Sequence, residues 1–422
     1  MGIAVNIATI APALEQLVAN SLRPQFEQET ATYNMFEKAA DTEFVNGKGF
    51  RVPSYLRPPV GVSGISEGGS FNQPGAPTND DMFVYPMNMS KAFEITGRVL
   101  SNVKDSSSMI KGLSGYMEFE MMALKKECNR QVFNDGSGQR GIVKSNSSTT
   151  VTLYNAIDHT PLSGYGSTKG GKFFEVDERY DLYNSTFATY YGTYRVLSKT
   201  AKTITTDSTI ANTTDGNIFV LSNSLYKMPR SLPYIVNNDT GTFQLQSRNT
   251  YPQLKAPVKD LAGASLTTAD FTYTKNLLIS RVGSSGKAKT LIALMSLAQD
   301  QALRQLGQNF KRWDGDAKVF DQSFDSWQHG DTVQSIDVDC DEDRVYLVVR
   351  DSIKKYEERP LDTYDADGNQ LRMRSGTAGY GADAYTGAMG GWWNWGCEEP
   401  RLNALIKRCS VVGLSTQVAD TV

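Results

Sequence analysis

The chain has 422 residues, 40% of them hydrophobic and 21% charged, so it is long enough to bury two or three cores. Its 43 basic and 46 acidic side chains give a net charge of -3, which excludes a protein-wide positive field that would attract nucleic acid or anionic lipid. No apolar run approaches the roughly 20 residues of a membrane-spanning helix, so we expect no contact with a membrane. Four scattered cysteines without a CxxC pair predict free thiols, and two histidines leave few candidates for a zinc site or a histidine-based triad.

Residues 1–45 are predicted to form an N-terminal arm, because residues 20–45 are polar and show no strong period. The arm begins with apolar residues at the spacing of an amphipathic helix: Ile7, Ile10, Leu14 and Val18. A strand at 48–57 and a second one at 82–96 are expected to pair as a long hairpin. Its tip would be the Gly- and Pro-rich loop 61–81, which has few large apolar side chains and so contributes little to a core.

Residues 106–133 show the strongest helical periodicity in the chain. Ser106, Ser107 and Ser108 offer N-caps, and Asn134-Asp135-Gly136 ends the helix. At about 1.5 Å per residue, this helix would be a strut some 35 Å or more long. Its apolar face is formed by residues that recur every three or four positions: Ile110, Leu113, Met117, Met121, Leu124, Cys128 and Val132.

Residues 145–254 are rich in Thr, Ser, Tyr and Asn with short β-prone stretches, which predicts an inserted β unit. Mixed α/β structure follows. We predict a helix from Thr268 to Val282, a buried strand at 290–295, a helix at 296–307, and two strands within 333–349 joined by an acidic turn.

The motifs that carry chemistry all favour structural interpretations. Gly283-Ser284-Ser285-Gly286-Lys287 fails as a phosphate loop, because Arg281 and Ala288 occupy positions that the motif reserves for Gly and for Ser or Thr. Asp365-Ala366-Asp367-Gly368-Asn369 begins like a calcium loop, but Gly376 replaces its bidentate Glu, so a hairpin turn is favoured. His329 has no partner at motif spacing and is interpreted as a surface or loop residue.

Two clusters remain, one acidic and one aromatic. A solvated strand and turn is favoured over a metal site for the acidic run Asp337, Asp339, Asp341, Glu342 and Asp343. A buried junction or a subunit contact is favoured over a sugar-stacking site for Trp392, Trp393 and Trp395. We therefore expect no catalytic residues, no metal site and no cofactor.

The order of these parts resembles the major capsid proteins of tailed bacteriophages. The resemblance covers nearly the whole chain except 145–250, and its specificity comes from the order of the parts. Three stretches carry it: Val62–Gly69 leading into the strand Phe83–Thr96, Phe133–Gly138 with Gly141–Val143, and Trp392–Arg408.

The resemblance implies an α+β capsid fold with the following parts. They are an N-terminal arm (1–45), an extended hairpin loop (46–97), a peripheral domain with a spine helix (98–144), an inserted β-rich domain (145–254), an axial domain around five- and six-fold axes (255–390), and a return to the peripheral domain (391–422). In such proteins the extended loop lies over a neighbouring subunit. The residues expected to make this contact are Ile65, Glu67, Gly68, Gly69 and Phe71.

The function implied is structural and not enzymatic. Subunits would assemble into pentamers and hexamers and then into an icosahedral shell that encloses double-stranded DNA without sequence preference. The protein would reside in the virion capsid after assembly in the host cytoplasm, with scaffolding, portal and cement proteins as further candidate partners. Lys48 and Lys91 are the only lysines of the hairpin segment, and we expect no covalent crosslink through them.

Two alternatives stay open from the sequence. One is an encapsulin-like compartment shell of the same fold, which would hold a cargo enzyme. The other is a carbohydrate-binding or hydrolytic protein whose tryptophans and carboxylates line a cleft.

Overall fold

The computed structural model describes residues 31–40, 43–57, 59–73, 75–98, 107–154, 170–210, 215–283, 291–308, 328–329, 332–364, 372–375 and 381–411. The amphipathic stretch of residues 7–18, the glycine-rich run after Gly283 and the turn at 365–369 lie outside these residues. No helix within the described ranges is long and apolar enough to cross a membrane.

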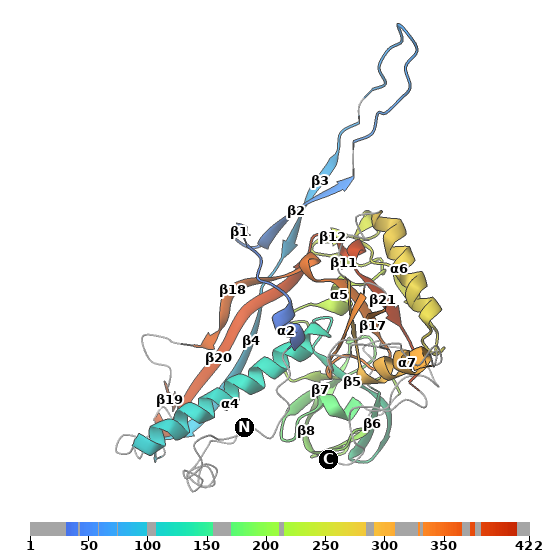
Figure 1. Ribbon diagram of the computed structural model, residues 1–422. Coiled ribbons are helices and arrows are strands. Elements are labelled where there is room, and N and C mark those ends of the chain that lie inside the picture. Colours follow the sequence, from blue (N-terminus) through green and yellow to red (C-terminus); the bar gives the residue numbers. More distant parts are fainter. Residues whose placement is uncertain are drawn as a thin grey trace, which may run out of the picture.

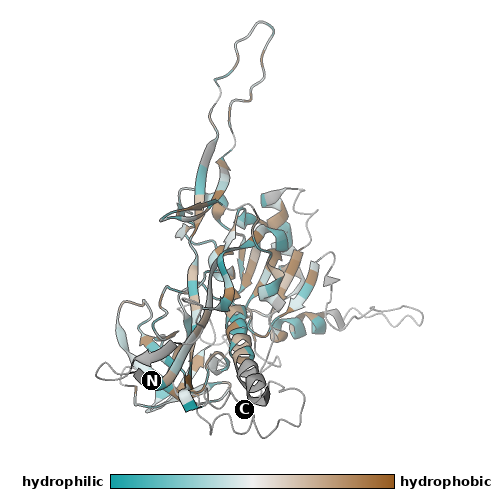
Figure 2. Ribbon diagram, turned by 90° about the vertical axis from the view of Figure 1, so that its left-hand side faces the viewer, coloured by the Kyte–Doolittle hydropathy of each residue, from teal (hydrophilic) through white to brown (hydrophobic). Residues whose placement is uncertain are grey.

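A narrow hairpin projects from the body of the molecule (Figure 1). Strand β2 (Gly49–Arg57) pairs antiparallel with β3 (Thr78–Val84), and β1 (Glu43–Val45) adds to the other edge of β2. The loop 59–77 beyond these strands stands clear of the body in both views (Figures 1 and 2).

The second strand of the hairpin is shorter than the sequence predicts. Pairing with β2 ends at Val84, and β4 (Met87–Thr96) joins a different sheet, antiparallel to β20 (Gly381–Cys397). Pro86 separates the two strands, and a proline has no N–H to continue a ladder. The prediction of one strand from 82 to 96 was therefore wrong.

Strand β20 lies in the middle of a four-stranded sheet. It pairs with β18 (Ile353–Thr363), β19 (Arg372–Ser375) and β4. Helix α4 (Ser107–Val132) packs against β4, where Cys128 Sγ lies 4.0 Å from Met89 Sδ and Lys91 forms an ion pair with Glu120 at 2.7 Å. Helix α2 (Ala31–Met35) packs on α4 through the Tyr33 N–H, which donates to Asn129 Oδ1 at 2.9 Å. Along α4, Figure 2 shows hydrophobic and hydrophilic residues side by side.

A closed six-stranded barrel follows α4, with strand order β10-β5-β6-β9-β8-β7. Its strands are β5 (Gln139–Ser147), β6 (Thr150–Tyr154), β7 (Arg179–Tyr183), β8 (Tyr190–Lys199), β9 (Thr203–Thr206) and β10 (Ile218–Leu221). A 3-10 turn, η1 (Gly170–Phe173), packs beside them, and the barrel has its own core around Phe174, Tyr180 and Leu182.

The barrel does not match the predicted inserted unit of 145–254. It begins at Gln139 and closes at Leu221, and the next segment returns to the core that contains α4. That segment holds α5 (Leu232–Ile235), β11 (Thr242–Phe243), β12 (Gln246–Ser247) and η2 (Pro252–Leu254). Leu232, Ile235 and Phe243 are fully buried there, so apolar burial assigns 222–256 to the body.

A six-stranded sheet forms the other half of the body, in the order β13-β21-β17-β14-β16-β15. Its strands are β13 (Val258–Asp260), β14 (Leu291–Met295), β15 (Gln328–His329), β16 (Thr332–Ile336), β17 (Val345–Val349) and β21 (Ala404–Lys407). Helices α6 (Thr268–Val282) and α7 (Leu297–Gln308) belong to the same part of the body as this sheet. The side chain of Thr267 caps α6 by accepting a hydrogen bond from the Asp270 N–H at 3.1 Å. Short 3-10 turns, η4 (Arg350–Ser352) and η6 (Pro400–Leu402), precede β18 and β21.

The boundary predicted between residues 390 and 391 falls inside strand β20. Residues 353–397, assigned to the axial unit or to the start of the return, supply β18 and β20 to the sheet beside α4. Strand β21, assigned to the return segment, instead lies between β13 and β17 in the six-stranded sheet. Strand partners far apart in the sequence fix both placements, and periodicity within one segment carries no information about them.

Candidate assembly surface and charged junction

The loop 59–77 exposes the residues that the resemblance singles out. Every described residue from 59 to 73 is exposed, with Phe71 89% and Ile65 42% accessible. The Gly69 N–H donates to the Ser66 carbonyl at 2.8 Å, which closes a turn that presents Glu67, and Gly68 takes a positive φ of 76°. Large apolar side chains held in water in this way are typical of surfaces that contact another molecule.

The predicted apolar face of α4 meets the main core in its C-terminal half. Leu124, Cys128 and Val132 are buried there, and Met117 and Met121 are partly buried against the same cluster. Ile110 and Leu113 belong to the first turns of α4, whose side chains lie outside the described residues.

The three tryptophans of β20 divide between its two faces, as alternation along a strand requires. Trp393 and Trp395 are each 1% exposed and pack edge-on against each other and against Tyr33 of α2, with ring centroids 6.1–6.4 Å apart. Trp392 points the other way and is 40% exposed. The buried pair thus ties the N-terminal arm to the sheet.

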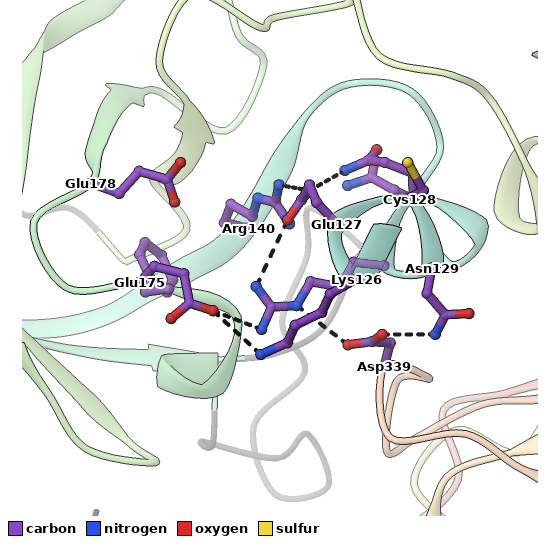
Figure 3. Close-up of polar contacts among 12 residues, drawn as sticks. Lys126, Glu127, Cys128, Asn129, Arg140, Glu175, Glu178 and Asp339 are labelled. Atoms are coloured by element: carbon purple, nitrogen blue, oxygen red, sulfur yellow. Dashed lines mark hydrogen bonds and ion pairs between the residues drawn. The ribbon is translucent and has the colours of Figure 1, made fainter. Parts of the chain in front are cut away.

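A cluster of charged side chains lies where α4, the barrel and the six-stranded sheet meet (Figure 3). We call it the charged junction: Lys126, Glu127, Arg130, Arg140, Glu175 and Asp339. Arg130 forms ion pairs with Glu175 of the barrel at 3.0 Å, with Asp339 at 3.3 Å and with Glu127 at 3.8 Å. One buried guanidinium therefore joins all three units.

Around the junction, burial and ion pairing have opposite effects on two barrel carboxyl groups. Burial alone would raise the pKa of Glu175, but Arg130, Lys199 and Lys126 hold it below its usual range. Burial raises the pKa of Glu178, even though Arg140 and a hydrogen bond from the Tyr180 hydroxyl at 2.8 Å favour its charged form. A cavity of about 720 Å³ opens beside these groups, between α4, β4 and the barrel loop that carries Glu175 and Glu178.

The acidic turn between β16 and β17 is buried, so the prediction of a solvated turn was wrong. Its carboxylates are between 0% and 7% exposed: Asp337, Asp339, Asp341, Glu342 and Asp343. Asn129 Nδ2 donates to Asp339 at 2.8 Å and to Asp337 at 3.2 Å, and the Thr32 hydroxyl also donates to Asp337. Donors from α4 and α2 replace water at Asp337 and Asp339, which is why these two acids tolerate burial. Arg344 lies 3.6 Å from Asp341 and 3.9 Å from Asp343.

This turn is the functional feature that sequence reasoning missed. Burial, and then the charge of Asp339, raise the pKa of Asp337 to about 6. The sequence did contain one signal of a buried polar partner, the pair Asn129-Arg130 at the end of an otherwise apolar helix face. It does not show which residues this pair contacts. Within the described ranges, no group of three or more His, Cys, Asp or Glu residues is placed to hold a metal ion. All four cysteines are free thiols and buried.

No protein-family model and no curated protein matches the sequence. Among solved structures, the subunit in the cyanophage A-1(L) capsid asymmetric unit is similar over 93% of this chain and 96% of its own length, with a TM-score of 0.55 and 12% sequence identity. This chain has the fold of a phage capsid protein. The capsid of a native GTA particle is similar over 93% of this chain and 94% of its own length (TM-score 0.49, 10% identity). The holo-SrpI encapsulin complex from Synechococcus elongatus PCC 7942 follows at 0.44 and 7% identity, covering 99% of this chain and 100% of its own.

Proposed function

We propose that the protein is a major capsid protein whose subunits assemble into pentamers and hexamers and then into an icosahedral shell around double-stranded DNA. The observation that carries this proposal is the projecting hairpin, whose loop exposes Ile65 and Phe71 on a chain with a capsid fold. An isolated two-stranded ribbon is marginal in water and becomes ordered when another surface buries it. A neighbouring subunit is the surface that a shell supplies at every position.

In the assembled shell, the turn with Glu67, Gly68 and Gly69 lies over the neighbour, with Ile65 and Phe71 packed beneath it. Helix α4 serves as the spine of the peripheral domain, together with the four-stranded sheet around β20. The six-stranded sheet with α6 and α7 forms the axial domain, and the barrel is the inserted unit. The charged junction fixes the orientation of these three parts, so a subunit enters the shell as one body.

Assembly of this kind needs heterologous contacts that close by rotation, first into rings and then into a shell. Each contact is modest and reversible, and repetition over many subunits makes the closed particle stable. DNA would be held without sequence preference by scattered Lys and Arg side chains, and salt would weaken this contact, since the net charge of -3 provides no general attraction. We further propose the virion as the location, assembly in the host cytoplasm, and scaffolding, portal and cement proteins as accessory partners.

Electron microscopy of the purified protein, together with sedimentation, tests the proposal. We expect closed particles of uniform diameter, and particles recovered from the natural source should contain nucleic acid. A protein that stays monomeric under all assembly conditions would refute a shell function. Closed particles filled with a cargo protein in place of nucleic acid would instead identify a compartment shell.

The loop itself provides a sharper test. The Gly75 N–H donates to the Val60 carbonyl at 2.7 Å, so the two arms of the loop are already adjacent. Replacing residues 61–74 with a short Gly-Ser turn should leave a soluble subunit of nearly unchanged thermal stability, because the described residues that it removes, 61–73, are all exposed. It should abolish closed shells in sedimentation and microscopy. Normal shells from this variant would mean that the loop is an ordinary surface feature.

A further inference from the structure

A second cavity, of about 440 Å³, lies between the segments that lead into β13 and β21 and the end of α6. Three of the side chains that line it are cationic, and the others are neutral. The lining residues are Asn238, Pro252, Gln253, Lys255, Arg281 and Arg401.

The topology explains why the cations converge. Strands β13 and β21 are parallel neighbours, so the turns that precede them, η2 and η6, lie at the same edge of the sheet. Helix α6 follows β13 and returns to that edge, which brings Arg281 of its last turn beside Arg401 of η6 and Lys255 after η2.

Within the described part of the chain, no ion pair joins Lys255, Arg281 or Arg401 to a carboxylate. Lys255 and Arg401 are half-buried, and Arg281 is exposed. Three like charges around one cavity repel one another and raise the local positive potential, although the whole chain is slightly acidic. The cavity is therefore suited to an anion.

The cavity lies near the base of the loop 59–77, because the Gln253 side chain donates to the carbonyl of Leu56, near the loop end of β2. The loop tip of the same chain is on the order of 30 Å away along an extended arm. It points away from the body in both views (Figures 1 and 2). A tip that enters this cavity must belong to another copy of the chain.

That tip carries one ionisable side chain. Among residues 59–77 only Glu67 is charged, and it sits in the turn closed by the Gly69 N–H and the Ser66 carbonyl at 2.8 Å. Its neighbours in the turn, Ser66, Gly68 and Gly69, have small side chains or none, and Glu67 itself is exposed, so the carboxylate is accessible to a partner.

We propose that the Glu67 carboxylate of one subunit occupies the cavity formed by Lys255, Arg281 and Arg401 of a second copy of this chain. The inference rests on the proposed shell function and deepens it, because it assigns a receptor to the loop tip. A carboxylate accepts two or more charge-assisted hydrogen bonds from guanidinium groups, which fixes the register between the two subunits. Salt screens such a contact, so assembly weakens as ionic strength rises.

Engineered disulfides test the contact without removing its charges. In Ser66→Cys/Asn238→Cys, one cysteine adjoins Glu67 and the other lines the cavity, while the four native thiols are buried. Oxidised particles should give a ladder of linked subunits on non-reducing denaturing gels. Adding Glu67→Gln should lower the linked fraction about tenfold. The matched control Ser66→Cys/Ser198→Cys, with its second cysteine exposed on the barrel, should give no ladder.

Microscopy of the wild type separates the two proposals. A wild type that forms no shells refutes the shell function. If the wild type forms shells but Ser66→Cys/Asn238→Cys gives no ladder, or gives a ladder that Glu67→Gln does not reduce, only the contact proposed here is overturned.

Charge reversal of the cavity provides a second test. Arg281→Glu/Arg401→Glu should lower the shell yield about tenfold, and adding Glu67→Arg should restore it. Normal shells that lose nucleic acid in the double variant would overturn the proposal and assign the cavity to a phosphate.

Discussion

Removing the guanidinium of Arg130 should destabilise the subunit far more than removing one on its surface. Arg130→Met keeps the apolar stem of this buried side chain but leaves three carboxylates without their shared cation. Glu175 is 44% exposed and keeps Lys126 and Lys199, and Glu127 keeps Arg140. The loss therefore concentrates on Asp339, whose side chain is 7% exposed and keeps a hydrogen bond from Asn129.

Breaking a buried ion pair by removing one partner costs about 3–5 kcal/mol. The matched control is Arg350→Met, which breaks a pair with Glu37 whose side chains are 48% and 69% exposed, and should cost about 0–1 kcal/mol. Urea unfolding of the isolated subunit, followed by tryptophan fluorescence, measures both. None of the five tryptophans lies within 139–221, and Trp392, Trp393 and Trp395 lie on β20, so the signal reports the sheet beside α4 and not the barrel. A loss for Arg130→Met no larger than for the control would refute the reasoning.

Two further predictions concern the acidic turn and α4. Because the pKa of Asp337 is raised from 3.8 to about 6, the stability it contributes is complete below about pH 4 and is lost as the pH rises through 6. Relative to Asp337→Asn, the wild type should therefore lose up to about 3 kcal/mol of unfolding free energy between pH 4 and 7, and a difference independent of pH would contradict this. Leu124→Asp buries a charge in the core and should prevent soluble expression, whereas Lys125→Ala, on the exposed face, should change stability by less than about 0.5 kcal/mol. Equal soluble yields of the two variants would show that the assigned face is wrong.

Elements with a local signal were predictable from the sequence. The long helix that ends before Asn134-Asp135-Gly136, the helix that begins after Thr267 and the apolar strand at 291–295 each carry periodicity, a cap or a continuous apolar run. These signals arise between residues a few positions apart, so they can be read from the sequence without knowing the fold.

Partners across the chain were not predictable in the same way. The sequence of residues 87–96 does not predict that this strand pairs with β20. The sequence of residues 404–407 likewise does not predict that β21 pairs with β13 and β17. The acidic turn shows the same limit for chemistry. Its carboxylates look solvent-exposed until Asn129 and Arg130, two hundred positions earlier, supply donors and a charge. The receptor proposed for Glu67 likewise exists only after η2, η6 and α6 are brought to one edge.

The order in which strands are synthesised also determines when the two sheets of a new chain are complete. The barrel is contiguous from 139 to 221 and can close as soon as that stretch is available. The central strand of one sheet is β20, and the strand that links β13 to β17 in the other is β21. At 5–20 residues per second, synthesis delivers these strands on the order of ten seconds or more after the barrel. Both sheets are completed only then, and the cavity near the base of the loop forms with them because Arg401 lies in η6, just before β21. If the proposed contact forms, a growing chain displays its loop tip well before its own cavity exists, so two neighbouring chains on one messenger pair reciprocally only when each is nearly finished.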